Sequence, residues 1–148
     1  METISQKKVI VSYLITSLLI FLVSATTSML GILGDASLPI AGSLSNELMA
    51  IVQLVVVLAA NLVLHGIFYY GGLNSSPMAK GLTIGVVLGL SYFMVSVFAL
   101  GVYDINSDPI HLLASALSGR VIEYSSGGIL TAIISVSDIH KWGLLRAF

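Results

Sequence analysis

The sequence predicts an all-α integral membrane protein, a bundle of four transmembrane helices, and three observations lead to this fold class. First, 57% of the 148 residues are hydrophobic and only 9% are charged, whereas about a quarter of the residues in a soluble domain are charged. Second, the mean hydropathy of the chain is +1.03. Third, four long apolar segments alternate with short segments rich in turn-forming residues. A lipid bilayer is therefore the expected solvent of this chain.

The first apolar segment predicts a helix over residues 9–33, after a short polar stretch that ends in Lys7 and Lys8. Two lysines before an apolar run also occur in secretory signal peptides, and residues 23–25 (Val-Ser-Ala) would resemble a cleavage site. The apolar run continues past that point and is long enough to cross a bilayer. We therefore expect a first transmembrane helix that is retained in the protein.

The second and third apolar segments predict helices over residues 46–70 and 77–101. Ser45 or Asn46 would cap the second helix, because its side-chain oxygen can accept a hydrogen bond from a free backbone N–H. Ser76 would cap the third helix, with Pro77 in the first helical position, where the missing N–H costs nothing. Both starts are typical of helices.

The fourth segment predicts a helix over residues 109–137, which begins with a second cap-and-proline pair, Asp108 and Pro109. Gly127 and Gly128 follow two serines near its middle, and this composition favours a kink or break there. Each of the four segments accommodates a membrane span of about 20–25 residues, which matches a hydrocarbon core of about 30 Å.

The basic residues outside the four segments predict the orientation of the chain. They all fall at one set of helix ends: Lys7, Lys8, Lys80, Lys141 and Arg146. The first and third loops contain acidic residues and neither lysine nor arginine. Because cytoplasmic loops carry an excess of positive charge, both termini are expected on the cytoplasmic side of the plasma membrane.

A charged pair in the middle of the fourth segment is the main candidate for a functional site. A charge at the bilayer centre costs about 2.5–3.5 kcal/mol, and residues three apart share one helix face, so Arg120 and Glu123 would offset part of that cost. With a rise of about 1.5 Å per residue, Arg120 lies roughly 16 Å from the start of its helix. Polar residues expected at similar depth complete a candidate cluster: Arg120, Glu123, Tyr124, Asn61 and Tyr92.

Three roles are open for this cluster. Intramembrane charges usually face a cavity or a partner, which favours a substrate or ion site. Alternatively, the ion pair is structural and pins the fourth helix against the second. In the third role, Arg120 contacts a partner subunit.

The third segment opens with three glycines spaced four residues apart, Gly81, Gly85 and Gly89. Such a ladder of small residues lets the backbone of another helix approach closely, so these residues are expected to pack against a helix. The sequence leaves open whether that helix belongs to the same bundle or to a second copy of the chain.

Several chemistries find no support in the sequence. There are no cysteines, so thiolate metal sites and cysteine catalysis are excluded. His65 and His111 fall near opposite membrane faces, so they are not expected to share a metal, and interfacial hydrogen bonding is their expected role. No G-x-S-x-G motif occurs, and neither histidine is expected to have a nucleophile at its own depth. We therefore predict no catalytic residues, no metal and no cofactor, and the near-zero net charge predicts no nucleic-acid partner.

These observations predict a single membrane domain, residues 1–148, whose partners are the lipid bilayer and a homo-oligomer or larger membrane complex. The expected function is that of a small non-catalytic subunit or assembly partner, because little mass lies outside the helices. The alternative is a small oligomeric transporter or channel that uses a midplane site at Arg120 and Glu123. A wet cavity that reaches Arg120 would favour transport, and a dry buried pair would favour a structural role.

Overall fold

The computed structural model contains four α-helices and, among the residues it describes, no strand. These residues are 6–29, 46–73, 75–95 and 109–137. In chain order they are α1 (Gln6–Met29), α2 (Asn46–Tyr70), α3 (Pro77–Met94) and α4 (Pro109–Val136). Their starts and ends agree closely with the four predicted segments, except that the predicted ends of the first and third helices lie outside the described residues.

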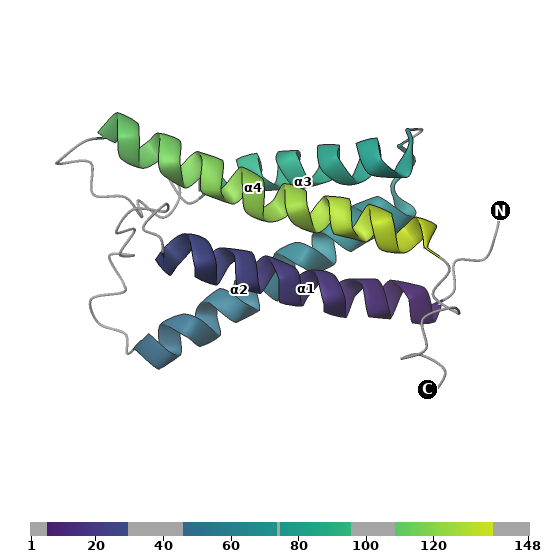
Figure 1. Cartoon of the computed structure of the whole chain (residues 1–148), viewed down its shortest axis with the longest axis horizontal. Helices are drawn as coiled ribbons and strands as arrows, with labels where there is room; N and C mark the ends of the chain where they lie inside the picture. The colour runs from purple at the N-terminus through teal and green to yellow at the C-terminus, as the bar shows by residue number, and fades with distance from the viewer. Residues whose placement is uncertain (1–5, 30–45, 74, 96–108, 138–148) are drawn as a thin grey trace.

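Consecutive helices run in opposite directions, and α2 is inclined to the other three (Figure 1). The first turns of α1 and α3 and the last turns of α2 and α4 share one end of the bundle (Figure 1). Lys7, Lys8 and Lys80 belong to this end, because they lie in the first turns of α1 and α3. We call it the lysine end.

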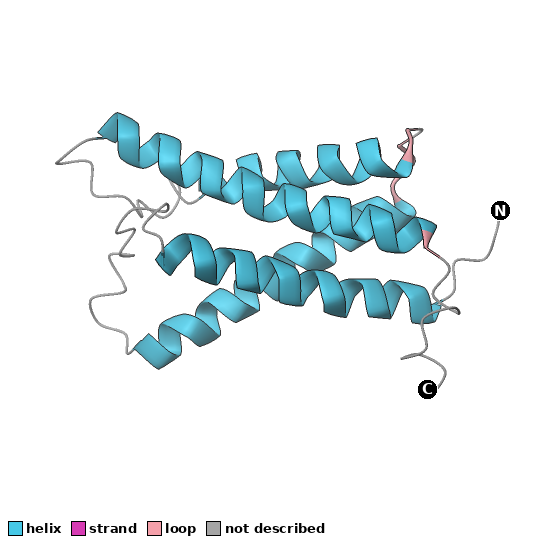
Figure 2. Ribbon diagram, in the orientation of Figure 1, coloured by secondary structure: helices cyan, strands magenta, loops and turns pink. Residues whose placement is uncertain are grey.

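The start of α3 confirms the predicted cap-and-proline pair. The Ser76 hydroxyl accepts a hydrogen bond from the Ala79 N–H at 3.4 Å, and Pro77 occupies the first turn. The Lys80 ammonium donates to the Gly71 carbonyl at 2.8 Å, across the turn that joins α2 to α3 (Figure 2). The turn at the lysine end is therefore fixed by contacts between both helices.

The glycine ladder of α3 packs against α4, which makes α3 and α4 the most closely packed pair of helices. A Cβ atom added at Gly89 would lie 2.7 Å from the Arg120 carbonyl oxygen. One added at Gly81 or Gly85 would collide with the backbone of α4, at Gly128 and Tyr124 respectively. Within the described structure, the ladder thus lies in an interface inside the bundle.

Helix α4 is helical without interruption from Pro109 to Val136, so no break occurs at Gly127 and Gly128. The two glycines face different helices. A Cβ atom at Gly127 would lie 2.6 Å from the Ile20 side chain of α1, and one at Gly128 would collide with α3. Their small size is used for close packing on two sides of α4.

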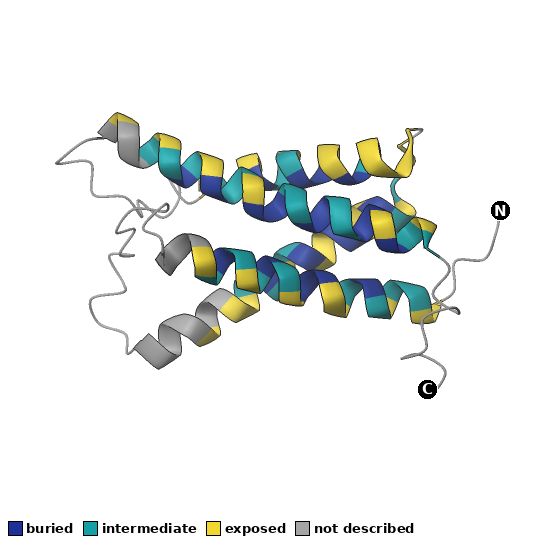
Figure 3. Ribbon diagram, in the orientation of Figure 1, coloured by how far each residue is buried: buried dark blue, intermediate teal, exposed yellow. Residues whose placement is uncertain are grey.

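Buried and exposed residues alternate along the helices (Figure 3), and the buried ones include an unusual share of polar side chains. Polar side chains lie fully or almost fully buried beside a small apolar core: Ser12, Thr16, Ser17, Ser24, Asn61, His65, Glu123 and Thr131. Large apolar side chains point outwards on all four helices, including Leu14 (60% exposed), Leu62 (64%) and Ile122 (54%). The outer surface of the helices is therefore mostly apolar.

Among the described residues, two helices are long and apolar enough to cross a membrane, over Gln6–Thr26 and Pro77–Met94. The apolar stretch Leu54–Tyr70 of α2 is shorter than a membrane span. Only 28% and 22% of the residues in the two candidate spans are buried inside the bundle. The core helix of a soluble protein would be mostly buried, so these two helices differ from it.

Candidate functional site

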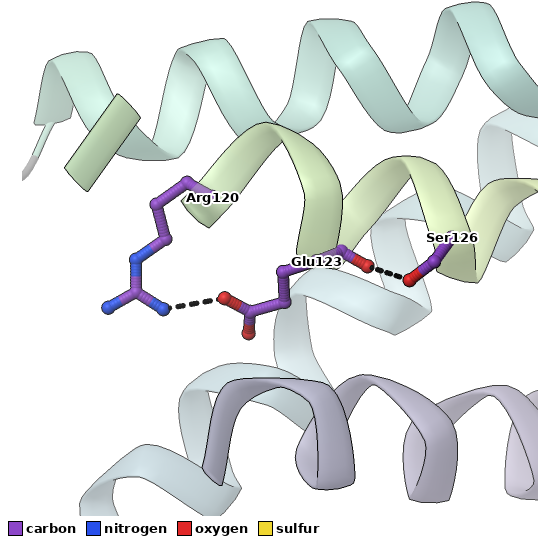
Figure 4. Close-up of polar contacts among 3 residues, drawn as sticks. All are labelled: Arg120, Glu123 and Ser126. Carbon is purple, nitrogen blue, oxygen red and sulfur yellow. Dashed lines mark hydrogen bonds and ion pairs between the residues drawn. The ribbon is translucent and has the colours of Figure 1, made fainter. Parts of the chain in front are cut away.

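Helix α4 places Arg120 and Glu123 one turn apart on the same face, and they form an ion pair (Figure 4). The distance between Arg120 Nη1 and Glu123 Oε2 is 2.8 Å. The Glu123 side chain is fully buried, whereas that of Arg120 is 18% exposed. The Ser126 hydroxyl donates to the backbone carbonyl of Glu123 at 2.8 Å, so the carboxylate itself stays free of that contact (Figure 4).

Two tyrosines complete the surroundings of the ion pair. The Arg120 guanidinium carbon lies 4.7 Å from the centre of the Tyr92 ring, which is the geometry of a cation–π interaction. The rings of Tyr92 and Tyr124 are 5.8 Å apart, and Tyr124 is fully buried. We call Arg120, Glu123, Tyr92 and Tyr124 the charged layer.

Three buried atoms of the charged layer have no hydrogen-bond partner among the described residues: Arg120 Nε, Glu123 Oε1 and the Tyr124 hydroxyl. Buried polar atoms in folded proteins are nearly always hydrogen-bonded, so each exception requires an explanation. The Ser24 hydroxyl of α1 interacts with the Glu123 carboxylate, although it does not form a hydrogen bond to Oε1. The charged layer therefore contains buried donor and acceptor atoms that no described residue satisfies.

Asn61 belongs to a different part of the interior. Its side-chain amide donates to the Tyr13 carbonyl at 3.0 Å and to the Ser17 hydroxyl at 2.6 Å, both on α1. The structure thus brings together four of the five residues expected in one cluster and directs the hydrogen bonds of Asn61 elsewhere. Similar depth in the bundle is enough to group Arg120, Glu123, Tyr124 and Tyr92. Depth alone does not specify which other helix a given helix face contacts.

His65 pairs with Ser12, and this contact overturns the expectation that neither histidine has a hydroxyl nucleophile at its depth. The distance from Ser12 Oγ to His65 Nε2 is 3.0 Å, and His65 Nδ1 lies 3.0 Å from the Asn61 carbonyl oxygen. Because a carbonyl only accepts, Nδ1 carries the proton, and in the neutral ring Nε2 accepts a hydrogen bond from Ser12. Both side chains are buried. We call Ser12, Ser17, Asn61 and His65 the neutral layer.

A signal for the Ser12–His65 contact exists in the sequence. Ser12, Thr16 and Ser24 are spaced by multiples of four, so they lie on one face of α1, and all three are fully buried. In antiparallel helices, a residue near the start of α1 meets one near the end of α2, which is where His65 stands. The hydroxyl stripe and the antiparallel order together would have predicted the pair.

The two layers are separated by an apolar contact. Ile20 stands on α1 between Thr16 and Ser24 and is fully buried in a cluster with Val57 and Tyr124. On the side of the neutral layer, the Thr16 hydroxyl lies 3.3 Å from the Thr131 hydroxyl of α4. The interior therefore alternates along α1 from polar to apolar to polar.

The described part of the chain contains no group of three or more His, Cys, Asp or Glu residues that could hold a metal ion. The side chain of His111 lies outside the described residues. His65 uses both ring nitrogens in the contacts given above. A metal site at His65 would have to displace both partners.

Comparisons with known proteins assign no family to this chain. No family model matches the sequence, and neither a curated protein nor a solved structure matches it. The fold and the two polar layers are therefore interpreted from the residues of the chain itself.

Proposed function

We propose that this chain is a small non-catalytic membrane protein whose four helices cross the plasma membrane and which serves as a subunit or assembly partner of a membrane complex. The observation that supports the membrane assignment is the combination of many exposed large apolar side chains with several buried polar ones. In water, a surface of this kind would drive association. In a bilayer, the same surface contacts lipid at no cost.

The contacts between the helices also fit a lipid environment. Lipid tails are as apolar as leucine, so helices in a membrane associate through close packing of small residues and through hydrogen bonds. Helices α3 and α4 use the glycine ladder for this purpose, and α1 and α2 use the neutral layer. These two helix pairs therefore use forms of contact that remain effective in a bilayer.

The lysine end is proposed to face the cytoplasm, since positively charged residues are enriched on that side of membranes. Lys7, Lys8 and Lys80 support this orientation. A cysteine introduced as Ser75→Cys, in the turn at this end, should then be protected from an impermeant thiol reagent added outside intact cells. Labelling of this cysteine from outside would reverse the orientation.

The proposed role as a partner is supported by Arg120. Its side chain is 18% exposed about halfway along α4. In a bilayer, a charge at this depth costs about 2.5–3.5 kcal/mol, and a neighbouring protein helix that covers the exposed part would reduce the cost.

Purification of the tagged chain in mild detergent, followed by mass spectrometry and measurement of particle mass, tests this function. We expect the chain to remain in the membrane fraction after carbonate washing and to co-purify with another membrane protein at a fixed ratio. Release by carbonate would contradict membrane insertion. A chain that stays in the membrane but purifies alone would contradict the role as a subunit.

A small oligomeric transporter or channel is the second candidate, and the three unpartnered atoms of the charged layer favour it. A site that binds a polar substrate needs donors and acceptors that the protein does not already use. Transport by the purified chain in liposomes, without any partner, would distinguish this function from that of a subunit.

A further inference from the structure

We infer that the bundle binds an uncharged lipid, whose apolar tail lies in a groove between α2 and α3 and whose carbonyl or hydroxyl head bonds to the charged layer. This inference goes beyond the proposed function and rests on the membrane-spanning position given there, because the ligand enters from the bilayer. Quinones and diacylglycerols share this chemistry, a neutral oxygen-bearing head on a long apolar tail.

The groove lies where α2 diverges from α3 (Figure 1). Its volume is about 190 Å³, and it is lined by Ala60, Val63, Leu88, Ser91, Tyr92 and Val95. The Ser91 hydroxyl donates to the Val87 carbonyl of its own helix at 2.8 Å, so it adds little polarity to the lining. An apolar cavity of about 150 Å³ is large enough to bind benzene. The groove therefore has room for a ring or for several methylene groups of a tail.

Tyr92 stands between the groove and the charged layer. It lines the groove, and its ring also lies 4.7 Å from the Arg120 guanidinium carbon and 5.8 Å from the Tyr124 ring. Two other lining residues, Ala60 and Leu88, pack against the same buried cluster that contains Tyr124. A single layer of side chains thus separates the groove from the charged layer. A turn of the partly buried Tyr92 side chain would join the two.

The charged layer favours an uncharged head. Arg120 and Glu123 neutralise each other, so an anionic or cationic head would add a net charge to the interior, where an unpaired charge is costly. Among the described residues, Arg120 Nε and the Tyr124 hydroxyl are donors without a partner, and Glu123 Oε1 is an acceptor without one. A carbonyl oxygen would accept from these donors, and a hydroxyl would also donate to Oε1.

Photoaffinity labelling of the full chain in phosphatidylcholine nanodiscs tests the site. The probe is a decyl benzoquinone with a diazirine in its tail, and mass spectrometry identifies the labelled residues. We expect labels on α2 and α3 beside the groove. Competition by unlabelled decylubiquinone, by dioctanoylglycerol or by both identifies the kind of lipid. Decanoate and decylammonium carry the same tail on a charged head and should not compete.

Three results of this experiment would overturn the inference. They are equal labelling of all four helices, competition by neither neutral lipid, and competition by a charged amphiphile as strong as that by the neutral ones. A chain that enters nanodiscs without being labelled would overturn the site and leave the proposed membrane role intact. A chain that does not enter nanodiscs would contradict membrane insertion, and the site with it.

Two neighbouring exposed residues of α2 provide matched variants for the groove. Val63→Trp fills the groove and should abolish labelling there. Leu62 is 64% exposed and lies outside the groove lining, so Leu62→Trp should be labelled like the wild-type chain. Equal labelling of the two variants would show that the tail binds elsewhere.

Tyr124→Phe tests the contact with the head. The change removes a buried hydroxyl that has no partner in the described structure, so the free energy of unfolding should not fall. Labelling by the quinone probe should nevertheless weaken, because one donor to its carbonyl oxygen is lost. Labelling equal to that of the wild-type chain would contradict a head bound at the charged layer.

Discussion

The neutral layer and the charged layer lie in the same bundle, only two to three helical turns apart along α1, yet their polar groups are satisfied to different degrees. In the neutral layer, hydroxyl, amide and imidazole groups bond across α1 and α2, and one buried atom, Asn61 Oδ1, has no partner among the described residues. In the charged layer, three buried atoms have none. A neutral polar layer can join two helices at a small desolvation cost, because most of its buried donors are paired with acceptors. The charged layer joins residues within α4 and on α3, and more of its buried polar atoms lack a partner in the described structure.

Removal of one member of the ion pair should produce the largest loss of stability. Arg120→Met or Glu123→Gln leaves the other residue without its partner, which for a buried pair costs about 3–5 kcal/mol. The double variant should cost much less, because no unpaired charge remains. The free energy of unfolding in detergent micelles measures each value. Additive losses would show that the two side chains do not stabilise each other, and each would then depend on a different partner.

The glycine ladder should show the next largest effect, and a glycine of α2 offers a matched control. Gly85→Ala places a Cβ atom against the backbone of α4, and overpacking of this kind costs about 1–3 kcal/mol. Gly66 is exposed in α2, with no atom within 4 Å of an added Cβ. Gly66→Ala should therefore stabilise the helix by about 0.5–1 kcal/mol. The same unfolding measurement compares the two variants, and equal effects would contradict close packing at Gly85.

The difference between the two layers also explains what the sequence could predict. Helix positions follow from local signals, such as apolar runs, the Ser76 cap and Pro77, and the structure agrees with them. The ion pair follows from spacing within one helix. Asn61 and His65 depend on which faces of different helices meet. The inclination of α2 and the antiparallel order of α1 and α2 decide this, and neither is encoded in a local pattern.

Gly127 and Gly128 illustrate the same limit. Two glycines in the middle of a helix weaken it locally, so a kink or break was expected. In the structure, the neighbouring helices α1 and α3 occupy the space that the missing side chains leave, and α4 continues through this point. Close packing from two sides compensates for the poor helix propensity, and this compensation appears only once the helices are assembled.

In the neutral layer, Ser12→Ala should cost about 1 kcal/mol, the typical net value of one hydrogen bond. The change removes the Ser12 hydroxyl, which lies 3.0 Å from Nε2 of buried His65 and donates its hydrogen bond to it. Ser118→Ala is the matched control, because exposed Ser118 bonds only to the Ser115 carbonyl of its own helix in the described structure. Unfolding in micelles should show a loss for Ser12→Ala and none for Ser118→Ala. Equal values would mean that the Ser12–His65 bond adds no stability.

The smallest effect is expected at Thr16 and Thr131, where one interhelical hydrogen bond can be broken from one side or removed with both partners. Thr131 donates its hydroxyl proton to the Gly127 carbonyl at 3.0 Å, so Thr16 is the donor in the 3.3 Å contact between the two hydroxyls. A single Thr16→Val change removes one interhelical hydrogen bond, which in membrane bundles averages about 0.6 kcal/mol.

Thr16→Val combined with Thr131→Val replaces both partners by apolar groups of the same shape, and such an exchange is nearly neutral for stability. The double variant should therefore lose less free energy of unfolding in micelles than Thr16→Val alone, which leaves the buried Thr131 hydroxyl without its donor. Additive losses from the two single changes would show that the two hydroxyls do not stabilise each other.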